Sequence, residues 1–332
     1  MPEVLHLVAC SDVHIGSYGS AMSKDGMNEG FLSNRRVRQF MLDWMKVNKP
    51  DVGFFVGDLY KSAIGRPTQT EQYEAAQWFR DWSLLCPVYA KRGNHDEGEA
   101  HGVSALEVFD LMNLRMTVLP EKSAEWSLVT VDGVRIAMYH GMLSGAMLES
   151  GMTSDSLREG LLGIRDAPSA HVYLLGDVHH RQFLAPNAAY CGALDRLNFG
   201  EEDETPSFWS IKVSEDGKIV WEAITTPARV FRTLTDESDV LFAADTALVK
   251  GAVVRFIGEL ETMTHSEMIA RLKEAGALEV ASISDTSELD ASPSMFASFD
   301  PPAAFSVWLD AQEGISASDK AFAAKLLPEV LS

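Results

Sequence analysis

Cysteine, positive charge and long apolar runs are all scarce in this chain of 332 residues. Its three cysteines, Cys10, Cys86 and Cys191, stand at unrelated spacings in apolar surroundings, which argues against a disulfide framework or a thiolate metal site and for three core residues. No run approaches the about 18 apolar residues that a membrane span needs, and the opening VLHLVACSD is strand-like with no basic segment ahead of it. We therefore expect a cytoplasmic protein that does not enter a membrane.

Lysine and arginine total 28 against 48 aspartates and glutamates, a formal net charge of −20. This argues against nucleic-acid binding through a generally basic surface, because Lys and Arg make the phosphate contacts. The excess of acidic residues is unevenly distributed along the chain. Residues 236–332 hold 6 Lys and Arg against 17 Asp and Glu, whereas residues 1–235 hold 22 Lys and Arg against 31 Asp and Glu. Bound divalent cations would also reverse the local sign wherever acids are ligands. The net charge therefore leaves a local DNA site open.

Short β-rich runs alternate with helix-period segments in the first half, which predicts an α/β layered sheet. The expected elements are strands at 5–10, 52–57 and 88–93 and helices at 33–48 and 70–85. From about residue 126 the strands follow one another closely, interrupted by one expected helix at 154–163, and this half is predicted to form a second sheet packed on the first.

The pattern of expected elements changes again after residue 225, where alternating helices and strands predict a small α/β domain. Its expected elements are helices near 237–247 and 264–275, strands at 251–257 and 277–283, and terminal helices within 303–331. With 46% hydrophobic residues the chain can bury a large and a smaller core. We predict two domains, residues 1–225 and residues 226–332.

Nearly every expected strand ends in side chains that can bind a metal. The stretches CSDVHIG, VGDLY, RGNHDEG, YHG and LGDVHH supply Asp12, His14, Asp58, Asn94, His95, Asp96, His140, Asp177 and His179. Loops at the carboxyl ends of strands converge on one crevice in an open α/β sheet. Mixed carboxylate, imidazole and amide donors suit Mn²⁺, Fe²⁺ or Zn²⁺, and two adjacent ions need about this many ligands, one of them a bridging carboxylate.

Each stretch alone has an ordinary explanation. Asp12 and His14, alternate residues on a segment expected to be extended, should point to one side and chelate one ion, but an isolated DxH is weak. Asp58 alone could cap a helix, and His140 could be a core histidine. GNHD is a stronger signal, because its glycine allows a sharp turn and Asn is seldom buried without a strong partner, although an ordinary turn also explains it. Five such stretches in order, each after an apolar strand, make coincidence a poor explanation.

The order DxH, GD, GNHD, lone His and G(H/D)xH resembles the calcineurin-like metallophosphoesterases. More narrowly, YCGALDRLNFGEEDETPSFWSIKV at residues 190–213, followed by TTPARVFRTL and GAVVRF, resembles the SbcD-type nuclease subunit of the SbcC–SbcD DNA repair complex, including phage-encoded versions. The likeness covers roughly residues 4–330. It implies a two-sheet metallophosphoesterase sandwich flanked by helices, with a small C-terminal α/β cap domain and terminal helices.

The resemblance also implies roles for the strand-end residues. One ion would be held by Asp12, His14, Asp58 and His179, and the other by Asp58, Asn94, His140 and Asp177, with Asp58 as the bridge and Mn²⁺ as the preferred ion. His95 would be the catalytic histidine that orients the scissile phosphate or protonates the leaving oxygen, as an imidazole titrating near neutral pH can. Asp96 would either orient His95 through a hydrogen bond or stabilise the turn.

Two positions depart from the family pattern. Lys61 stands where many members have Asp or His, but this position is not a ligand in the SbcD-type arrangement. Asp177 stands where most members have His. A carboxylate is also a ligand, harder and anionic, so metal binding should survive with a shift toward Mn²⁺, and loss of function is the alternative.

The sequence supports only weaker predictions for several other residues. His180 is expected at the surface rather than behind the ligands, and His101 in a loop. The candidates for DNA phosphate contacts, each also explained as solvated surface, are Lys91, Arg92, Arg196, Arg229 and Arg232. The amphipathic spacing of Phe305, Trp308 and Leu309 fits core packing and a partner surface equally well.

The sequence thus favours a Mn²⁺-dependent DNA nuclease subunit with exonuclease and single-strand endonuclease capacity, acting with an SbcC-like ATPase in DNA recombination, repair or replication. The resemblance implies a homodimer formed through helices that flank the early motifs. One alternative is a phosphatase or small-molecule phosphodiesterase of the same fold. Another is a catalytically silent scaffold subunit, against which the nearly complete set of expected ligands argues.

Overall fold

The computed structural model describes residues 4–23, 25–61, 67–97, 103–148, 150–246 and 248–283. The chain divides into two compact units, Met1–Ser284 and Asp285–Ser332, and all described residues belong to the first. The predicted helices within 303–331, and with them Phe305, Trp308 and Leu309, lie outside the described residues, as does His101. Within the described ranges no helix is both long and apolar enough to cross a membrane.

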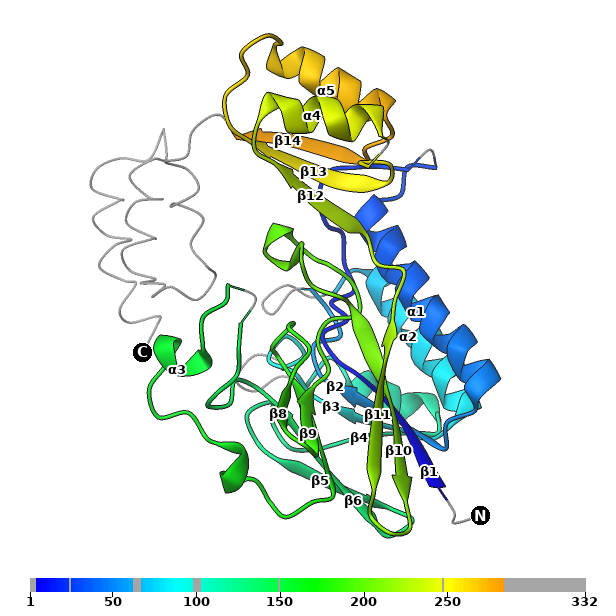
Figure 1. Cartoon of the computed structure of the whole chain (residues 1–332). Helices are drawn as coiled ribbons and strands as arrows, with labels where there is room; N and C mark the ends of the chain where they lie inside the picture. Colours follow the sequence, from blue (N-terminus) through cyan, green and yellow to red (C-terminus); the bar gives the residue numbers. More distant parts are fainter. Residues whose placement is uncertain are drawn as a thin grey trace, which may run out of the picture. The chain divides into compact units, whose positions relative to one another are not determined.

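The first sheet has six strands in the order β11-β10-β1-β2-β3-β4 (Figure 1). Strands β1 to β4 run parallel, and β10 pairs antiparallel with both β1 and β11. The strands are β1 (Val4–Cys10), β2 (Val52–Val56), β3 (Val88–Lys91), β4 (Met116–Val118), β10 (Ser207–Ser214) and β11 (Ile219–Thr225). Helices α1 (Glu29–Asn48), α2 (Gln69–Leu85) and the 3-10 helix η1 (Glu107–Met112) pack on one face.

The second sheet has five strands in the order β5-β6-β7-β9-β8. They are β5 (Ser127–Val131), β6 (Val134–His140), β7 (Val172–Gly176), β8 (Phe183–Ala185) and β9 (Ala188–Tyr190). Val8 and Cys10 of β1 belong to the core under the helices, whereas Leu7 and Ala9 belong to the core between the two sheets. Both faces of β1 are therefore buried over residues 7–10, which explains the apolar run LVAC at its end. The predicted α/β sandwich of two sheets flanked by helices is confirmed.

The expected helix at 154–163 is wrong. Helix α3 spans only Ser154–Leu157, because Arg158 is already extended and Gly160 has a φ of 72°, a conformation that leaves the helix. The 3-10 helices η2 (Ile164–Asp166) and η3 (Phe199–Glu201) also lie in this half. Helix α1 begins four residues before its expected start, where the side chain of Asn28 accepts a hydrogen bond from the Phe31 amide and caps it.

A third sheet, which we call the cap sheet, consists of three parallel strands in the order β12-β13-β14. They are β12 (Val230–Leu234), β13 (Ala252–Ile257) and β14 (Glu279–Ile283), connected by α4 (Glu237–Asp245) and α5 (His265–Glu274). Val240, Phe256 and Met268 are among the residues of its own hydrophobic core. The α/β pattern expected here agrees with the structure, and the boundary between residues 225 and 226 stays a prediction.

Candidate metal centre

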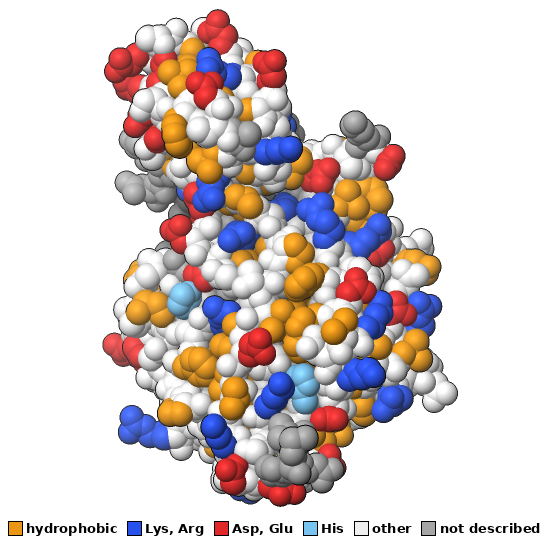
Figure 2. All heavy atoms as spheres, turned by 45° about the vertical axis from the view of Figure 1, so that its right-hand side comes forward, with side chains coloured by type: hydrophobic (Ala, Val, Ile, Leu, Met, Phe, Trp, Pro, Cys, Tyr) orange, Lys and Arg blue, Asp and Glu red, His pale blue; other side chains and the backbone are white. Residues whose placement is uncertain are grey.

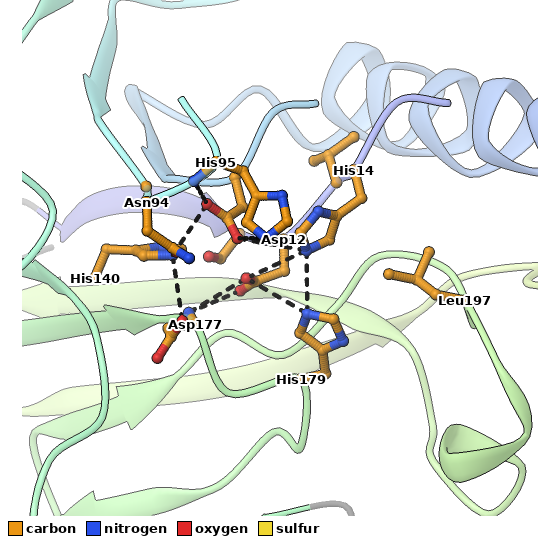
Figure 3. Close-up of polar contacts among 12 residues, drawn as sticks. Asp12, His14, Asn94, His95, His140, Asp177, His179 and Leu197 are labelled. Carbon is orange, nitrogen blue, oxygen red and sulfur yellow. Dashed lines mark hydrogen bonds and ion pairs between the residues drawn. The ribbon is translucent and has the colours of Figure 1, made fainter. Parts of the chain in front are cut away.

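The carboxyl ends of β1, β2, β3, β6 and β7 and the loops after them carry side chains that meet at one place, and Figure 3 shows most of these side chains. They bring together eight of the nine residues that the sequence singled out, namely Asp12, His14, Asp58, Asn94, His95, His140, Asp177 and His179. The side chains come from segments far apart in the sequence. Their meeting follows from the parallel arrangement, because the carboxyl ends of parallel strands share one edge.

The backbone at this end is strained. Among the described residues, seven other than glycine have a positive φ, and four of them are expected ligands: Asp12, His14, Asp58 and Asp177. Such conformations cost about 1–3 kcal/mol each and persist where the surroundings hold them. The amides of Asp12 and His14 donate to the carbonyls of Gly57 and Asp58, both at 3.0 Å. The expectation that Asp12 and His14 lie on an extended segment is therefore wrong, although their side chains do converge.

Asp12, His14 and His179 form the first group of possible ligands. The Nε2 atoms of His14 and His179 face each other at 3.1 Å, and Asp12 Oδ1 lies 3.8 Å from the first and 3.7 Å from the second. Burial lowers the pKa of His14 to about 3 and raises the pKa of Asp12 to about 7. His14 is thus a neutral imidazole, the form that binds a metal.

Asp58 lies between this group and the next. Its Oδ2 atom is 3.6 Å from His14 Nε2, and its Oδ1 atom is 3.2 Å from His140 Nε2. Burial alone would raise the pKa of Asp58, but His140 and His14 together hold it below its ordinary value. A carboxylate that turns one oxygen to each of two imidazoles has the placement that a bridging ligand requires.

The second group surrounds His140. Its Nε2 atom lies 3.1 Å from Asn94 Oδ1, 3.2 Å from Asp58 Oδ1 and 3.8 Å from Asp177 Oδ1. Burial would lower the pKa of His140, but the carboxylates of Asp58, Asp12 and Asp177 raise it well above the usual value. A nitrogen facing three oxygens needs a cation among them, either a proton or a metal. Asn94 itself is exposed.

Two of the expected ligand histidines, His140 and His179, each make a hydrogen bond through the Nδ1 atom. His140 Nδ1 donates to the carbonyl of Val56 at 2.6 Å, and His179 Nδ1 donates to Glu201 Oε1 at 2.8 Å. When Nδ1 carries the proton, the Nε2 atom of a neutral ring presents its lone pair to the site. The donor set therefore fits divalent metal ions. Glu201 was missed because nothing in the local sequence separates it from the neighbouring acids of FGEEDE.

His95 stands at the rim of the site. Its Nδ1 atom donates to the carbonyl of Lys61 at 2.8 Å, its Nε2 atom lies 3.9 Å from Asp58 Oδ2, and its ring meets that of His14 edge-on. Lys61 thus contributes a backbone carbonyl, which any residue type supplies. This contact therefore does not restrict the residue type at position 61.

Asp96 stabilises the turn rather than orienting His95. Its carboxylate is buried and accepts hydrogen bonds from the amides of Gly93, Asp58 and Leu59 at 2.9, 2.8 and 2.8 Å. Among the described residues, no hydrogen bond joins it to the His95 ring. Gly93 is required for the same turn, because a Cβ there would collide with the backbone nitrogen and side chain of Asp58.

Two of the candidates for phosphate contacts are buried and cannot meet DNA. Lys91 is fully buried, and its Nζ atom donates to the Lys122 carbonyl and to Ser127 Oγ. Arg229 is 4% exposed and donates to the carbonyl of Arg196. On the face shown in Figure 2, Lys and Arg lie interspersed with Asp and Glu, so this face carries no continuous basic surface.

The remaining candidates are partly exposed. Arg92 pairs with Glu107 at 2.6 Å, and Arg196 donates to the Glu204 carbonyl. Arg232 is partly buried in β12. His180 is 37% exposed and pairs with Glu204 at 2.7 Å, which agrees with the surface position expected for it.

Comparison with known proteins gives a family match for the part of the chain that holds six of the eight converging residues, whereas Asp177 and His179 lie beyond it. Residues 5–161 match the family model of the calcineurin-like phosphoesterases. No curated protein matches the chain. Among solved structures, Vps29 of Entamoeba histolytica in complex with Zn²⁺ matches with 10% identity and a TM-score of 0.30, covering 66% of this chain and 98% of the Vps29 chain. At that similarity Vps29 carries no weight for function.

Proposed function

Because the chain carries a calcineurin-like metallophosphoesterase domain, we propose that it is a metal-dependent DNA nuclease subunit with exonuclease and single-strand endonuclease capacity. It would act with an SbcC-like ATPase in DNA recombination, repair or replication, as a homodimer in the cytoplasm. The observation that carries the hydrolytic part is the position of Asp58 between His14 and His140. The choice of DNA rests on the resemblance of residues 190–213 to SbcD-type subunits.

The ligand set divides into two overlapping halves. Asp12, His14, Asp58 and His179 would hold one ion, and Asp58, Asn94, His140 and Asp177 the other. Two divalent ions, with Mn²⁺ preferred, would supply an activated water and neutralise charge on the scissile phosphate. Asp177 reaches His140 only at 3.8 Å, and its role as a ligand is part of this proposal.

His95 is suited to handle the proton of the leaving group. Its Nδ1 proton is committed to the Lys61 carbonyl, so Nε2 is the atom that gains and loses a proton. The side chain is 23% exposed, enough for a phosphate oxygen to approach it. A protonated Nε2 would orient the phosphodiester through a hydrogen bond and then pass its proton to the departing oxygen.

The cap sheet contacts the loop that follows the first ligands. The Glu279 carboxylate of β14 accepts hydrogen bonds from the Ser20 amide and hydroxyl and from the Ala21 amide. This loop continues directly from Asp12 and His14. The contact between the cap sheet and this loop supports the proposed role of the cap domain, which would meet DNA and help to select ends.

The proposal is tested by Mn²⁺-dependent digestion of end-labelled linear DNA with wild type and His95→Ala, alone and with the ATPase. We expect cleavage by wild type and a loss of about 100-fold or more in the variant, the usual range for a general acid. Absence of cleavage by wild type in both settings would overturn the nuclease assignment. Hydrolysis of p-nitrophenyl phosphates without DNA cleavage would favour the phosphatase or small-molecule alternative, and no hydrolysis of either would favour the scaffold.

A further inference from the structure

Glu201 is a buried acid placed directly behind a metal ligand. It is 3% exposed, and its Oε1 atom accepts the Nδ1 proton of His179 at 2.8 Å. Oε1 also accepts from the Asn198 amide group at 3.1 Å, and Oε2 accepts from the Leu197 amide at 2.7 Å. Leu197 lies on the side of His179 away from Asp177 (Figure 3). The carboxylate is thus held by its own loop, and it in turn holds His179.

The short helix that carries Glu201 is also fixed to the cap sheet. Glu202, the next residue, accepts hydrogen bonds from the Thr233 amide at 2.8 Å and from the Thr233 hydroxyl at 2.5 Å. Phe199, at the start of η3, packs edge-on against Phe231 of β12, and the Arg255 guanidinium of β13 lies over its ring at 4.5 Å. One turn of chain therefore contacts a metal ligand on one side and two cap strands on the other.

We propose that Glu201 is a positioning residue that orients His179 for metal binding, and that η3 makes this orientation depend on the placement of the cap sheet. The inference rests on the proposed metal-dependent function. Without the carboxylate, the Nδ1 proton of His179 loses the acceptor that holds it there, and the ring can place its proton on Nε2, the atom that faces Asp12 and His14. Groups that hold a ligand histidine in this way typically contribute 10–100-fold to metal affinity.

The chain contains a matched control for this contact. Glu204 holds His180 through the same Nδ1-to-carboxylate hydrogen bond, at 2.7 Å, three residues after Glu201. His180 directly follows His179 but is not among the residues grouped around the metal centre. Replacing Glu204 therefore removes the same kind of interaction, and the same charge, without touching a ligand.

The experiment titrates the full-length, metal-free protein with Mn²⁺ and follows free Mn²⁺ by electron paramagnetic resonance. We expect one of two bound ions to be weakened about 10–100-fold by Glu201→Ala and less by Glu201→Gln, which keeps the shape and one acceptor oxygen. Glu204→Ala should bind like wild type. Thermal melting without metal identifies any variant that fails to fold. If Glu201→Ala fails to fold, the affinity of Glu201→Gln is compared with that of wild type instead. Equal Mn²⁺ affinity in wild type and in both folded Glu201 variants would overturn the positioning role.

The dependence on the cap sheet needs a double-mutant cycle. Thr233→Val removes the hydroxyl that binds Glu202, and Thr235→Val removes a hydroxyl that binds Asp239 within the cap itself. We expect Thr233→Val to weaken the same ion about two- to tenfold, within the usual range of coupling between sites, and Thr235→Val to have no effect. In the Glu201→Ala background the effect of Thr233→Val should vanish. An undiminished effect there would show that the cap does not act through Glu201.

The experiments distinguish a failure of the positioning role of Glu201 from a failure of the proposed nuclease function. If wild type binds Mn²⁺ but cleaves no DNA, the nuclease assignment fails and the role of Glu201 is still measured by affinity. If wild type cleaves DNA and the Glu201 variants bind Mn²⁺ normally, only the positioning role is lost.

Discussion

Metal binding should weaken sharply in mild acid, because the ion must displace a proton from Asp12. Burial raises the pKa of this carboxyl to about 7, so below that pH most of the protein carries a proton where the metal needs an anion. For a single group with this pKa, the apparent affinity falls about tenfold between about pH 8 and about pH 6. The sign follows from the direction of the shift: affinity is lost as the pH falls through about 7. His140, whose pKa is also raised, must lose its proton too, which steepens the dependence.

The assay is a calorimetric titration with Mn²⁺ at several pH values, repeated at about pH 7 in buffers of different ionisation enthalpy. The buffer series counts the protons released, and we expect at least about half a proton per chain from Asp12 alone. Asp12→Asn, which cannot release that proton, should bind the first ion poorly at every pH. An affinity independent of pH between about 6 and 8, with no proton release, would refute the assignment of Asp12 as a buried ligand.

Two further predictions concern single side chains. Burial lowers the pKa of Lys91 to about 8. Between about pH 7.5 and 9.5, denaturant unfolding should therefore show the free energy of unfolding rising by about 2 kcal/mol more in wild type than in Lys91→Met. If the free energy of unfolding changed equally with pH in both proteins, the burial of the ammonium group would be contradicted. Asp177→His should keep Mn²⁺-dependent hydrolysis, whereas Asp177→Ala should lose at least about tenfold, since a ligand should contribute no less than the residues behind it. An Asp177→Ala protein with wild-type Mn²⁺ affinity would show that Asp177 is not a ligand.

The layered fold could be predicted because its signals are local. Strands such as β1 and β2 are continuous apolar runs, and the helices between them repeat with helical period. The error at 154–163 arose where apolar residues suggested a helix but Gly160 and Gly163 favoured turns. Leu157 and Leu161 are only half-buried and Leu162 is 44% exposed, so the apolar pattern there does not mark the buried face of a helix.

The meeting of the expected ligands at one place could be predicted because each stands at or just after the end of a buried strand, and strand ends share one edge of the sheet. What could not be predicted depends on contacts between distant segments. Glu201 meets His179 across 22 residues, and the Val56 carbonyl meets His140 across 84. Lys91 looked like a surface cation because a lysine in sequence gives no sign that Ser127 and a carbonyl will enclose its ammonium group.

The central claim is a two-metal centre bridged by Asp58. Anomalous diffraction from crystals of the protein soaked in Mn²⁺ tests it most directly, because it locates each ion independently of activity. We predict two peaks about 3.5–4 Å apart, one near His14 and His179 and the other near His140, with Asp58 between them. A single peak, or two peaks that Asp58 does not join, would contradict the account.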